Sequence, residues 1–328
     1  MKIKEFIDRH ERVKVIWEAL QKNSDEQFRK RVLGTDCLNI SVMENTNIDR
    51  KTGKSGILYQ IEMGTWGDGF FAEYKKLLNY LYFADFFQWK PCVHFSNQFT
   101  YAEDHPVNGT ENPFEYFFEP IVKMDDANEY RYYVNSREVD WEFANRLKPV
   151  NGYDISEKYI QAMSEISQKY IKFNDITLRY LQSTDDLLGK NKVLGVHVRL
   201  TDFKQNFLGH PVCITAEEHL KYAVDAVKKY GFNKIFLATD DVSTVDLFRK
   251  EFGNDLLYYE DVTRSSGDVS VAFSDNVREN HHYKLALEVI RDMYTLSRCN
   301  GLIAGKSQVS ICACLLYTSP SPRDRSVS

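Results

Sequence analysis

Short apolar runs alternate with longer amphipathic segments through the second half of the chain. Residues 193–198, 234–238, 256–259 and 301–304 form four such runs, each of a length that suits a buried strand. In the segments between them, apolar residues recur at every third or fourth position, the spacing of a helix with one buried face. This alternation predicts βαβ units and therefore a parallel sheet.

Helix-start signals support the same assignment. Thr215 and Glu218 have the spacing of a capping box, which predicts a helix beginning after Thr215. Asp241 stands at the N-cap position of the next helix, expected over 243–252. A longer amphipathic helix is expected over 280–298, directly before the last strand.

The first half of the chain mixes helical and strand patterns without regular alternation. The expected elements are helices over 1–34, 70–87 and 154–186 and strands over 57–63 and 93–95. Residues 101–120 are rich in aromatic and polar side chains, and we expect a surface loop there. This loop and residues 262–279 are candidates for acceptor contact on that ground.

These patterns predict an α/β protein of two domains. Residues 1–180 are expected to form a mixed α/β acceptor-side domain with a helical bridge, and residues 181–313 a Rossmann-like donor domain. Composition changes abruptly after Ala313, and the remaining residues resemble the translation of a sequencing adaptor. We therefore expect residues 314–328 to be an artefact that truncates the second domain.

Charge and composition exclude several classes of protein. The formal net charge is −5 and the sequence has no long basic run, which disfavours nucleic acid as a partner. No apolar run approaches the roughly 20 residues of a membrane span, and the charged N-terminus lacks the features of a signal peptide. We therefore expect a cytoplasmic protein without a transmembrane segment. Its six scattered cysteines are expected to be free thiols rather than zinc ligands.

Polar residues follow three of the predicted strands at the point where each strand ends. They are His197, Arg199 and Asp202, then Asp240 and Asp241, then Lys306, Ser307 and Gln308. Because the carboxyl ends of parallel strands meet at one edge of a sheet, we expect these side chains to converge. An arginine beside helix N-terminal amides and a hydroxyl suits a diphosphate.

Two glycine motifs carry less information. The segment from Gly301 to Ser307 resembles a phosphate-binding P-loop but is one residue too short. Gly64, Gly67 and Gly69 follow a predicted strand and open a helix, but their spacing differs from that of a dinucleotide-binding loop, so they indicate only close backbone approach.

No metal site is expected either. The adjacent carboxylates of Asp240 and Asp241 have no further ligands at a suitable spacing. The pair His281 and His282, at the start of a predicted helix, is expected to be solvated.

Three segments together resemble a known family. Residues 195–202 (GVHVRLTD), 235–241 (IFLATDD) and 292–297 (DMYTLS) with Ser307 and Gln308 resemble the donor-site motifs of the α-1,6-fucosyltransferases. That family includes the core N-glycan and nodulation-factor enzymes, within the wider O-fucosyltransferase-like superfamily. The resemblance covers about a third of the chain, and the first half is similar only loosely, through the loop of Gly64 and Gly67.

The resemblance implies a GT-B-like architecture of two Rossmann-like domains. It also implies inverting, metal-independent transfer of fucose from GDP-fucose to a glycan hydroxyl, with no cofactor. Carried over, Arg199 would hold the β-phosphate of the donor, and His197 and Asp292 would contact the guanine. Ser307 and Gln308 would complete the phosphate site.

The resemblance implies further roles for residues around this centre. Asp240 and Asp241 would order the cleft, touching the ribose or the loop of Arg199, and Gly64 and Gly67 would approach the donor from the first half of the chain.

The chain departs from the family at two places. The paired arginines of the family are reduced to Arg199 followed by Leu200, where Lys204 or Lys306 could substitute. The family's acidic residue is absent between 203 and 208, so Asp202 is the candidate acceptor base. Two loop carboxylates remain alternatives, Asp268 and Asp275.

These departures leave two other interpretations open. One keeps the fold with a different nucleotide-sugar donor, and the other is a non-catalytic protein that binds a nucleotide sugar or a glycan. The acceptor, the linkage and the oligomeric state are not specified by the sequence.

Overall fold

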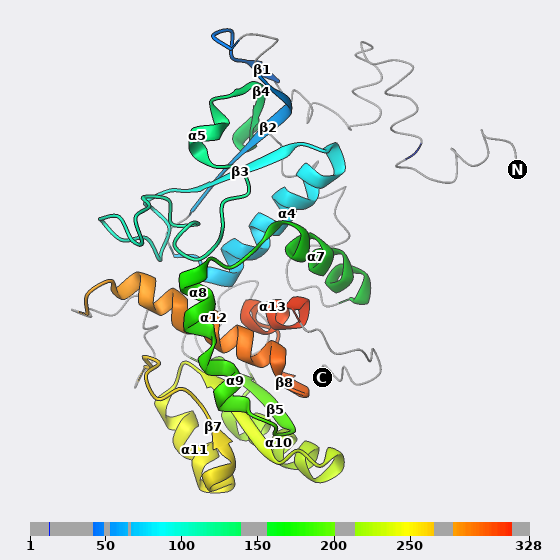
Figure 1. Ribbon diagram of the computed structural model, residues 1–328. Helices are drawn as coiled ribbons and strands as arrows, with labels where there is room; N and C mark the ends of the chain where they lie inside the picture. The colour runs from blue at the N-terminus through cyan, green and yellow to red at the C-terminus, as the bar shows by residue number, and fades with distance from the viewer. Residues whose placement is uncertain are drawn as a thin grey trace, which may run out of the picture.

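The computed structural model describes residues 42–48, 53–64, 67–138, 156–200, 214–265 and 278–316, together with Val13 (Figure 1). These residues form a mixed α/β fold with two four-stranded sheets. The helix predicted over 1–34 lies outside the described residues, apart from Val13. No helix in the described ranges is long and apolar enough to cross a membrane.

The second sheet contains the four strands that the apolar runs predict. They are β5 (Val193–Val198), β6 (Lys234–Thr239), β7 (Leu256–Leu257) and β8 (Gly301–Ala304). Their order is β7-β6-β5-β8 and all neighbours are parallel, which confirms the predicted parallel sheet. Only β7 is shorter than predicted.

Helices cover both faces of this sheet. α10 (Ala216–Tyr230) and α11 (Val242–Phe252) lie on one face, where they share a core with β5 and β6. α12 (His281–Arg298) lies on the other face, with a second core around Phe236 and Ala238. The connecting helices therefore switch from one face of the sheet to the other at the neighbouring strands β5 and β8. Ligands of open α/β sheets bind in the crevice at such a point, outside the carboxyl ends of the strands.

Capping interactions fix the ends of these helices. The predicted capping box is confirmed, since Thr215 Oγ1 accepts from the Glu218 backbone N at 3.2 Å and Glu218 Oε2 accepts from the Thr215 N at 3.1 Å. α12 has no side-chain cap from its own N-cap residue. Instead, Glu103 Oε1 accepts a hydrogen bond of 2.9 Å from the Tyr283 backbone N. A loop of the first half thus holds the start of α12.

The first sheet has a mixed arrangement of strands. Its strands are β1 (Met43–Glu44), β2 (Lys54–Met63), β3 (Lys90–Phe95) and β4 (Tyr130–Asn135), in the order β1-β4-β2-β3. β2 is parallel to β3 and β4, whereas β1 is antiparallel to β4. The strands predicted over 57–63 and 93–95 are confirmed and extend further at their N-terminal ends. The sequence patterns did not predict β1 or β4.

The aromatic segment over 101–120 is a surface loop only in part, since residues such as Asp104 and Asn108 are exposed whereas its aromatic rings are buried. Phe114, Tyr116, Phe117 and Phe118 are all buried, and the Phe117 ring stacks on Tyr283 of α12 with centroids 5.4 Å apart. The segment therefore forms core between the first half of the chain and α12. The rings are buried because packing them together removes a large apolar surface from water. Acceptor contact by this segment stays a prediction.

Besides two short 3₁₀ helices, η1 (Ser136–Glu138) and η3 (Gly253–Asp255), six further α-helices complete the described structure. They are α4 (Phe70–Phe87), α5 (Met124–Ala127), α7 (Glu157–Tyr170), α8 (Asp175–Leu181), α9 (Ser183–Leu188) and α13 (Gln308–Leu316). The helix predicted over 70–87 is confirmed, whereas the pair of helices predicted over 154–186 is three helices, the last of which ends at Leu188. α13 follows β8 and contacts α4 and α7, so the chain returns to its first half (Figure 1).

The domain boundaries remain predictions. The proposed boundary after residue 180 falls within α8. α13 continues three residues beyond Ala313 to Leu316, and Leu315 is buried. The proposal that residues 314–328 are an artefact also stays a prediction.

Close packing of α12 against β5 depends on Gly195. A Cβ atom at this position would lie 3.1 Å from Leu296 Cδ2 and 3.2 Å from Cys299 Sγ. We expect Gly195→Ala to lower the free energy of unfolding by about 1–3 kcal/mol, because the crowded core has to shift. Chemical denaturation measures this loss. Gly69→Ala is the control, since a Cβ there meets nothing within 4 Å in the described structure; equal losses for both variants would contradict the prediction.

Candidate active site

A pocket of about 100 Å³ lies at the carboxyl edge of the second sheet. Residues from the ends of β5 and β6, the loop after β7, α12, α13 and the aromatic segment line it. They are Tyr101, His197, Arg199, Thr239, Asp240, Val262, Thr263, Leu285, Glu288, Val289, Asp292 and Val309. Four residues that the sequence singled out therefore converge here: His197, Arg199, Asp240 and Asp292.

Arg199 lines the pocket and is paired with Asp240. Its Nη1 atom is 3.1 Å from Asp240 Oδ2, and 31% of the arginine side chain is exposed. Asp240 Oδ1 also accepts a hydrogen bond of 3.1 Å from the Leu200 backbone N. Asp240 thus orients both the guanidinium and the backbone that follows β5. The Arg199 side chain is still exposed enough to contact a ligand.

His197 is a buried, neutral imidazole. Burial, and next the charge of Arg199, lower its pKa to about 3. Its Nδ1 atom is 3.2 Å from Ser307 Oγ, which itself accepts from the Ser310 backbone N at 3.2 Å. This contact links the end of β5 to the start of α13. His197 and Ser307 therefore lie close together, as the sequence predicted.

Asp292 is a buried carboxylate in the wall of the pocket. It is 8% exposed, and its Oδ1 atom has no hydrogen-bond partner in the described structure. Burial raises its pKa to about 7, while Arg264 and Arg291 act in the opposite direction. An unsatisfied acceptor of this kind is costly unless a ligand supplies donors.

Glu288, one turn before Asp292, is a second buried acid that the sequence analysis missed. Its Oε2 atom accepts from the Thr263 backbone N at 3.2 Å, and its Oε1 atom accepts from Arg278 Nη1 at 2.5 Å. The spacing of four residues places both acids on one face of α12. This spacing is the feature of the sequence that could have indicated Glu288 as a site residue.

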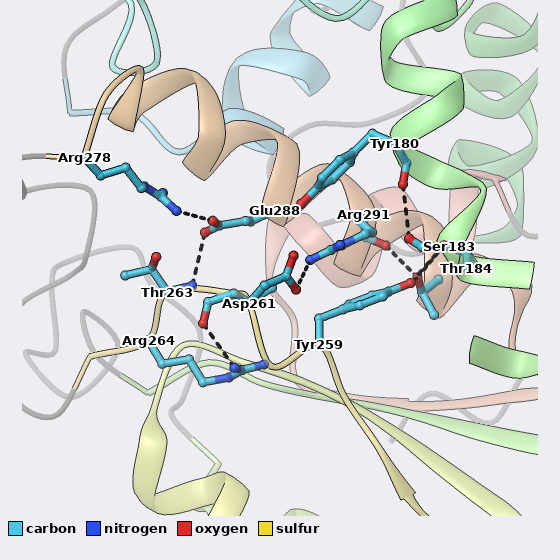
Figure 2. Close-up of polar contacts among 12 residues, drawn as sticks. Tyr180, Ser183, Thr184, Tyr259, Asp261, Thr263, Arg264, Arg278, Glu288 and Arg291 are labelled. Atoms are coloured by element: carbon cyan, nitrogen blue, oxygen red, sulfur yellow. Dashed lines mark hydrogen bonds and ion pairs between the residues drawn. The ribbon is translucent and has the colours of Figure 1, made fainter. Parts of the chain in front are cut away.

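The loop after β7 is anchored to α12 beside the pocket. Asp261 pairs with Arg291 at 2.6 Å, and the Arg291 guanidinium lies 3.8 Å from the Tyr259 ring centroid and 4.5 Å from that of Tyr180. Figure 2 shows this buried arginine between the two rings, with Thr263 reaching Glu288 farther along the helix. These contacts hold the loop in one place against the pocket wall.

The remaining site candidates lie elsewhere or have structural contacts. Asp241 caps α11, since its Oδ2 atom accepts from the Thr244 backbone N at 2.8 Å, and it does not line the pocket. Gln308 opens α13 and is not a lining residue either. Gly64 follows β2 in the first sheet, where it borders a separate pocket of about 570 Å³. Gly67, close by in the same loop, donates its backbone N–H to Thr100 Oγ1.

Other candidates fall on undescribed positions. Asp202, Lys204, Asp268 and Asp275 all lie outside the described residues. Among those described, no group of three or more His, Cys, Asp or Glu could hold a metal ion. His281 is buried, contrary to the expectation of a solvated pair.

Comparison with known proteins finds distant structural likeness. No protein-family model and no curated protein matches the chain. A NodZ α-1,6-fucosyltransferase soaked with GDP-fucose is similar at 15% identity and a TM-score of 0.48, over 80% of this chain and 93% of that one. NodZ from Bradyrhizobium gives 14% identity and a TM-score of 0.48, over 80% and 94%. POFUT1 in complex with GDP-fucose gives 13% and 0.49, over 84% and 99%.

Proposed function

We propose that the protein is a glycosyltransferase that transfers fucose from GDP-fucose to a glycan hydroxyl. The transfer proceeds without a metal ion and with inversion at the anomeric carbon. The observation that carries the proposal is the Asp292 Oδ1 atom, which has no hydrogen-bond partner in the described structure and lies in a pocket that Arg199 also lines.

The base-binding part of the proposal rests on Asp292. An ionised carboxylate accepts hydrogen bonds and donates none, so its ligand has to present N–H groups. Guanine presents two adjacent donors, N1–H and the N2 amino group, which match the two oxygens of a carboxylate. The neutral His197 lies on the same pocket wall, at the end of β5.

The phosphate-binding part rests on Arg199 and the start of α13. A guanidinium binds two phosphate oxygens at once, and the first amides of a helix favour an anion. Ser307, which precedes α13, is held by His197 and Ser310, so this helix start is fixed relative to β5. Arg199 exchanges part of its contact with Asp240 for the diphosphate.

The reaction follows from where charge develops. The acceptor hydroxyl attacks the anomeric carbon from the face opposite the phosphate, and the bond between that carbon and the β-phosphate oxygen breaks. Negative charge then builds on GDP, where Arg199 stabilises it more strongly than in the ground state. Asp202 is the proposed base that removes the hydroxyl proton.

A nucleotide panel tests the donor. We expect GDP to raise the thermal unfolding midpoint by several degrees at saturating concentration, and ADP and UDP to raise it far less. Stabilisation by UDP and not by GDP would favour the same fold with another donor. Release of GDP from GDP-fucose without an added acceptor then separates an enzyme from a binding protein.

A further inference from the structure

Arg264 is a partly buried cation whose donors are incompletely used. It directly follows Val262 and Thr263, which line the pocket, and is not itself a lining residue. Its Nη1 atom donates to the Val262 carbonyl at 3.2 Å, and its guanidinium carbon lies 5.4 Å from the Tyr258 ring centroid. Its Nε and Nη2 atoms are buried and have no hydrogen-bond partner in the described part of the chain. Because arginine stays protonated in proteins, these donors require an acceptor that the described residues do not provide.

The backbone around Arg264 is fixed at the edge of the sheet. The Ser265 backbone N donates to the Asp240 carbonyl at 2.8 Å, and the Val242 N donates to the Ser265 carbonyl at 3.1 Å. On the other side of Arg264, Thr263 is bonded to Glu288 of α12. Figure 2 shows Arg264 on this anchored loop, next to Asp261 and Thr263. Its position is therefore built into the fold before any ligand binds.

Arg264 and Asp292 are charges that act on each other without pairing. Arg264 is the largest influence that lowers the pKa of Asp292, and Asp292 is the largest influence that raises the pKa of Arg264 against its burial. Both keep buried polar atoms without a hydrogen-bond partner among the described residues, so neither satisfies the other. A ligand between them has to offer hydrogen-bond acceptors to Arg264 and donors to Asp292.

Guanine has this arrangement of groups on neighbouring edges. Its N1–H and N2 amino groups are donors, and O6 and N7 are acceptors that arginine recognises with two hydrogen bonds. Adenine presents an amino donor where guanine has O6, and it lacks the paired donors. We propose that Arg264 is a specificity residue that binds the O6 and N7 edge of guanine while Asp292 binds the neighbouring N1–H and N2 edge. This inference rests on the proposed function, since it requires a guanine nucleotide in the pocket.

The charges around Arg264 favour the base over the diphosphate as its ligand. The acidic groups that influence it are Asp292, Glu288 and Asp261, all on or against α12. Arg199, by contrast, is paired with Asp240 at the strand ends. The two arginines thus serve opposite ends of one nucleotide.

Replacing N7 of the ligand tests the contact without changing the protein. In calorimetric titrations, 7-deaza-GDP, which has C–H in place of N7, is expected to bind the wild-type protein roughly tenfold or more weakly than GDP. Arg264→Met keeps the bulk of the side chain and should bind the two ligands equally and weakly. Arg249→Met is the matched control, because Arg249 lies 5.4 Å from the same Tyr258 ring but is about half exposed. It should keep the full preference for GDP.

The outcomes separate this inference from the proposed function. Equal binding of GDP and 7-deaza-GDP by the wild-type protein would overturn the role of Arg264 and leave GDP binding intact. A phosphate-binding role would give the same equality, with Arg264→Met weakening both ligands. Failure of GDP to bind at all would overturn the proposed function and the inference with it. Because the ligand comparison uses the wild-type protein, it remains decisive if Arg264→Met does not fold.

Discussion

Replacing Arg199 with alanine is expected to reduce the turnover of GDP-fucose by at least about a hundredfold. The guanidinium faces charge that develops as the donor bond breaks, and losing one such group typically costs about that factor or more. The effect should fall mainly on kcat, because the contact strengthens in the transition state. Steady-state rates of GDP release measure it.

Two variants separate charge from geometry in this test. Arg199→Lys keeps the charge but loses the bidentate contact, so it should recover only a small part of the activity. Arg249→Ala removes an exposed arginine paired with Asp246 outside the pocket, and it should retain wild-type turnover. Wild-type rates in Arg199→Ala would refute the role of Arg199.

Replacing Asp292 with asparagine is expected to weaken GDP binding roughly a hundredfold and to remove its dependence on pH near neutrality. The ionised carboxylate binds the guanine donors, and its pKa in the free protein is raised to about 7. Below pH 7, wild-type affinity should therefore fall by about tenfold per pH unit, and above it the affinity should level off. An asparagine side chain has one acceptor oxygen instead of two, and it does not ionise near pH 7.

The stability of the free protein should change in the opposite direction. The pKa of Asp292 is 3.8 unfolded and about 7 folded, so the folded state holds a proton between these values that the unfolded state has lost. Its contribution to stability is full below pH 4 and is lost as pH rises through 7. Rising pH thus destabilises the free protein while it strengthens GDP binding.

Calorimetric titrations and urea denaturation across pH 5–9 measure both effects. Titration of the GDP phosphates is common to the two proteins, so the difference between wild type and Asp292→Asn isolates the carboxylate. Asp246→Asn, on the exposed side of α11, is the control and should follow the wild type. A variant Asp292→Asn with an unchanged affinity profile would contradict the role of Asp292.

Local patterns predicted the second sheet well. β5, β6 and β8 are short apolar runs between amphipathic helices, and the caps at Thr215 and Asp241 use only neighbouring residues. Each of these features depends on contacts within a few positions of the chain. The sequence therefore contained enough information for the order of elements and for the edge where His197, Arg199 and Asp240 meet.

Features that depend on distant contacts were missed. β4 pairs with β2 across more than 70 positions, and the aromatic segment around Phe117 is buried only because α12 packs on it. Local patterns cannot show which faces meet. Arg264 belongs to the same class, since its burial arises from the anchoring of its loop to Glu288 and Arg291 of α12.

A structure of the protein with bound GDP tests the central claim most directly. The account predicts the guanine against Asp292 and the β-phosphate on Arg199, near the start of α13. GDP bound elsewhere, as in the separate pocket beside Gly64 and Lys76, or a pocket with Asp292 still unpartnered at saturating GDP, would contradict it.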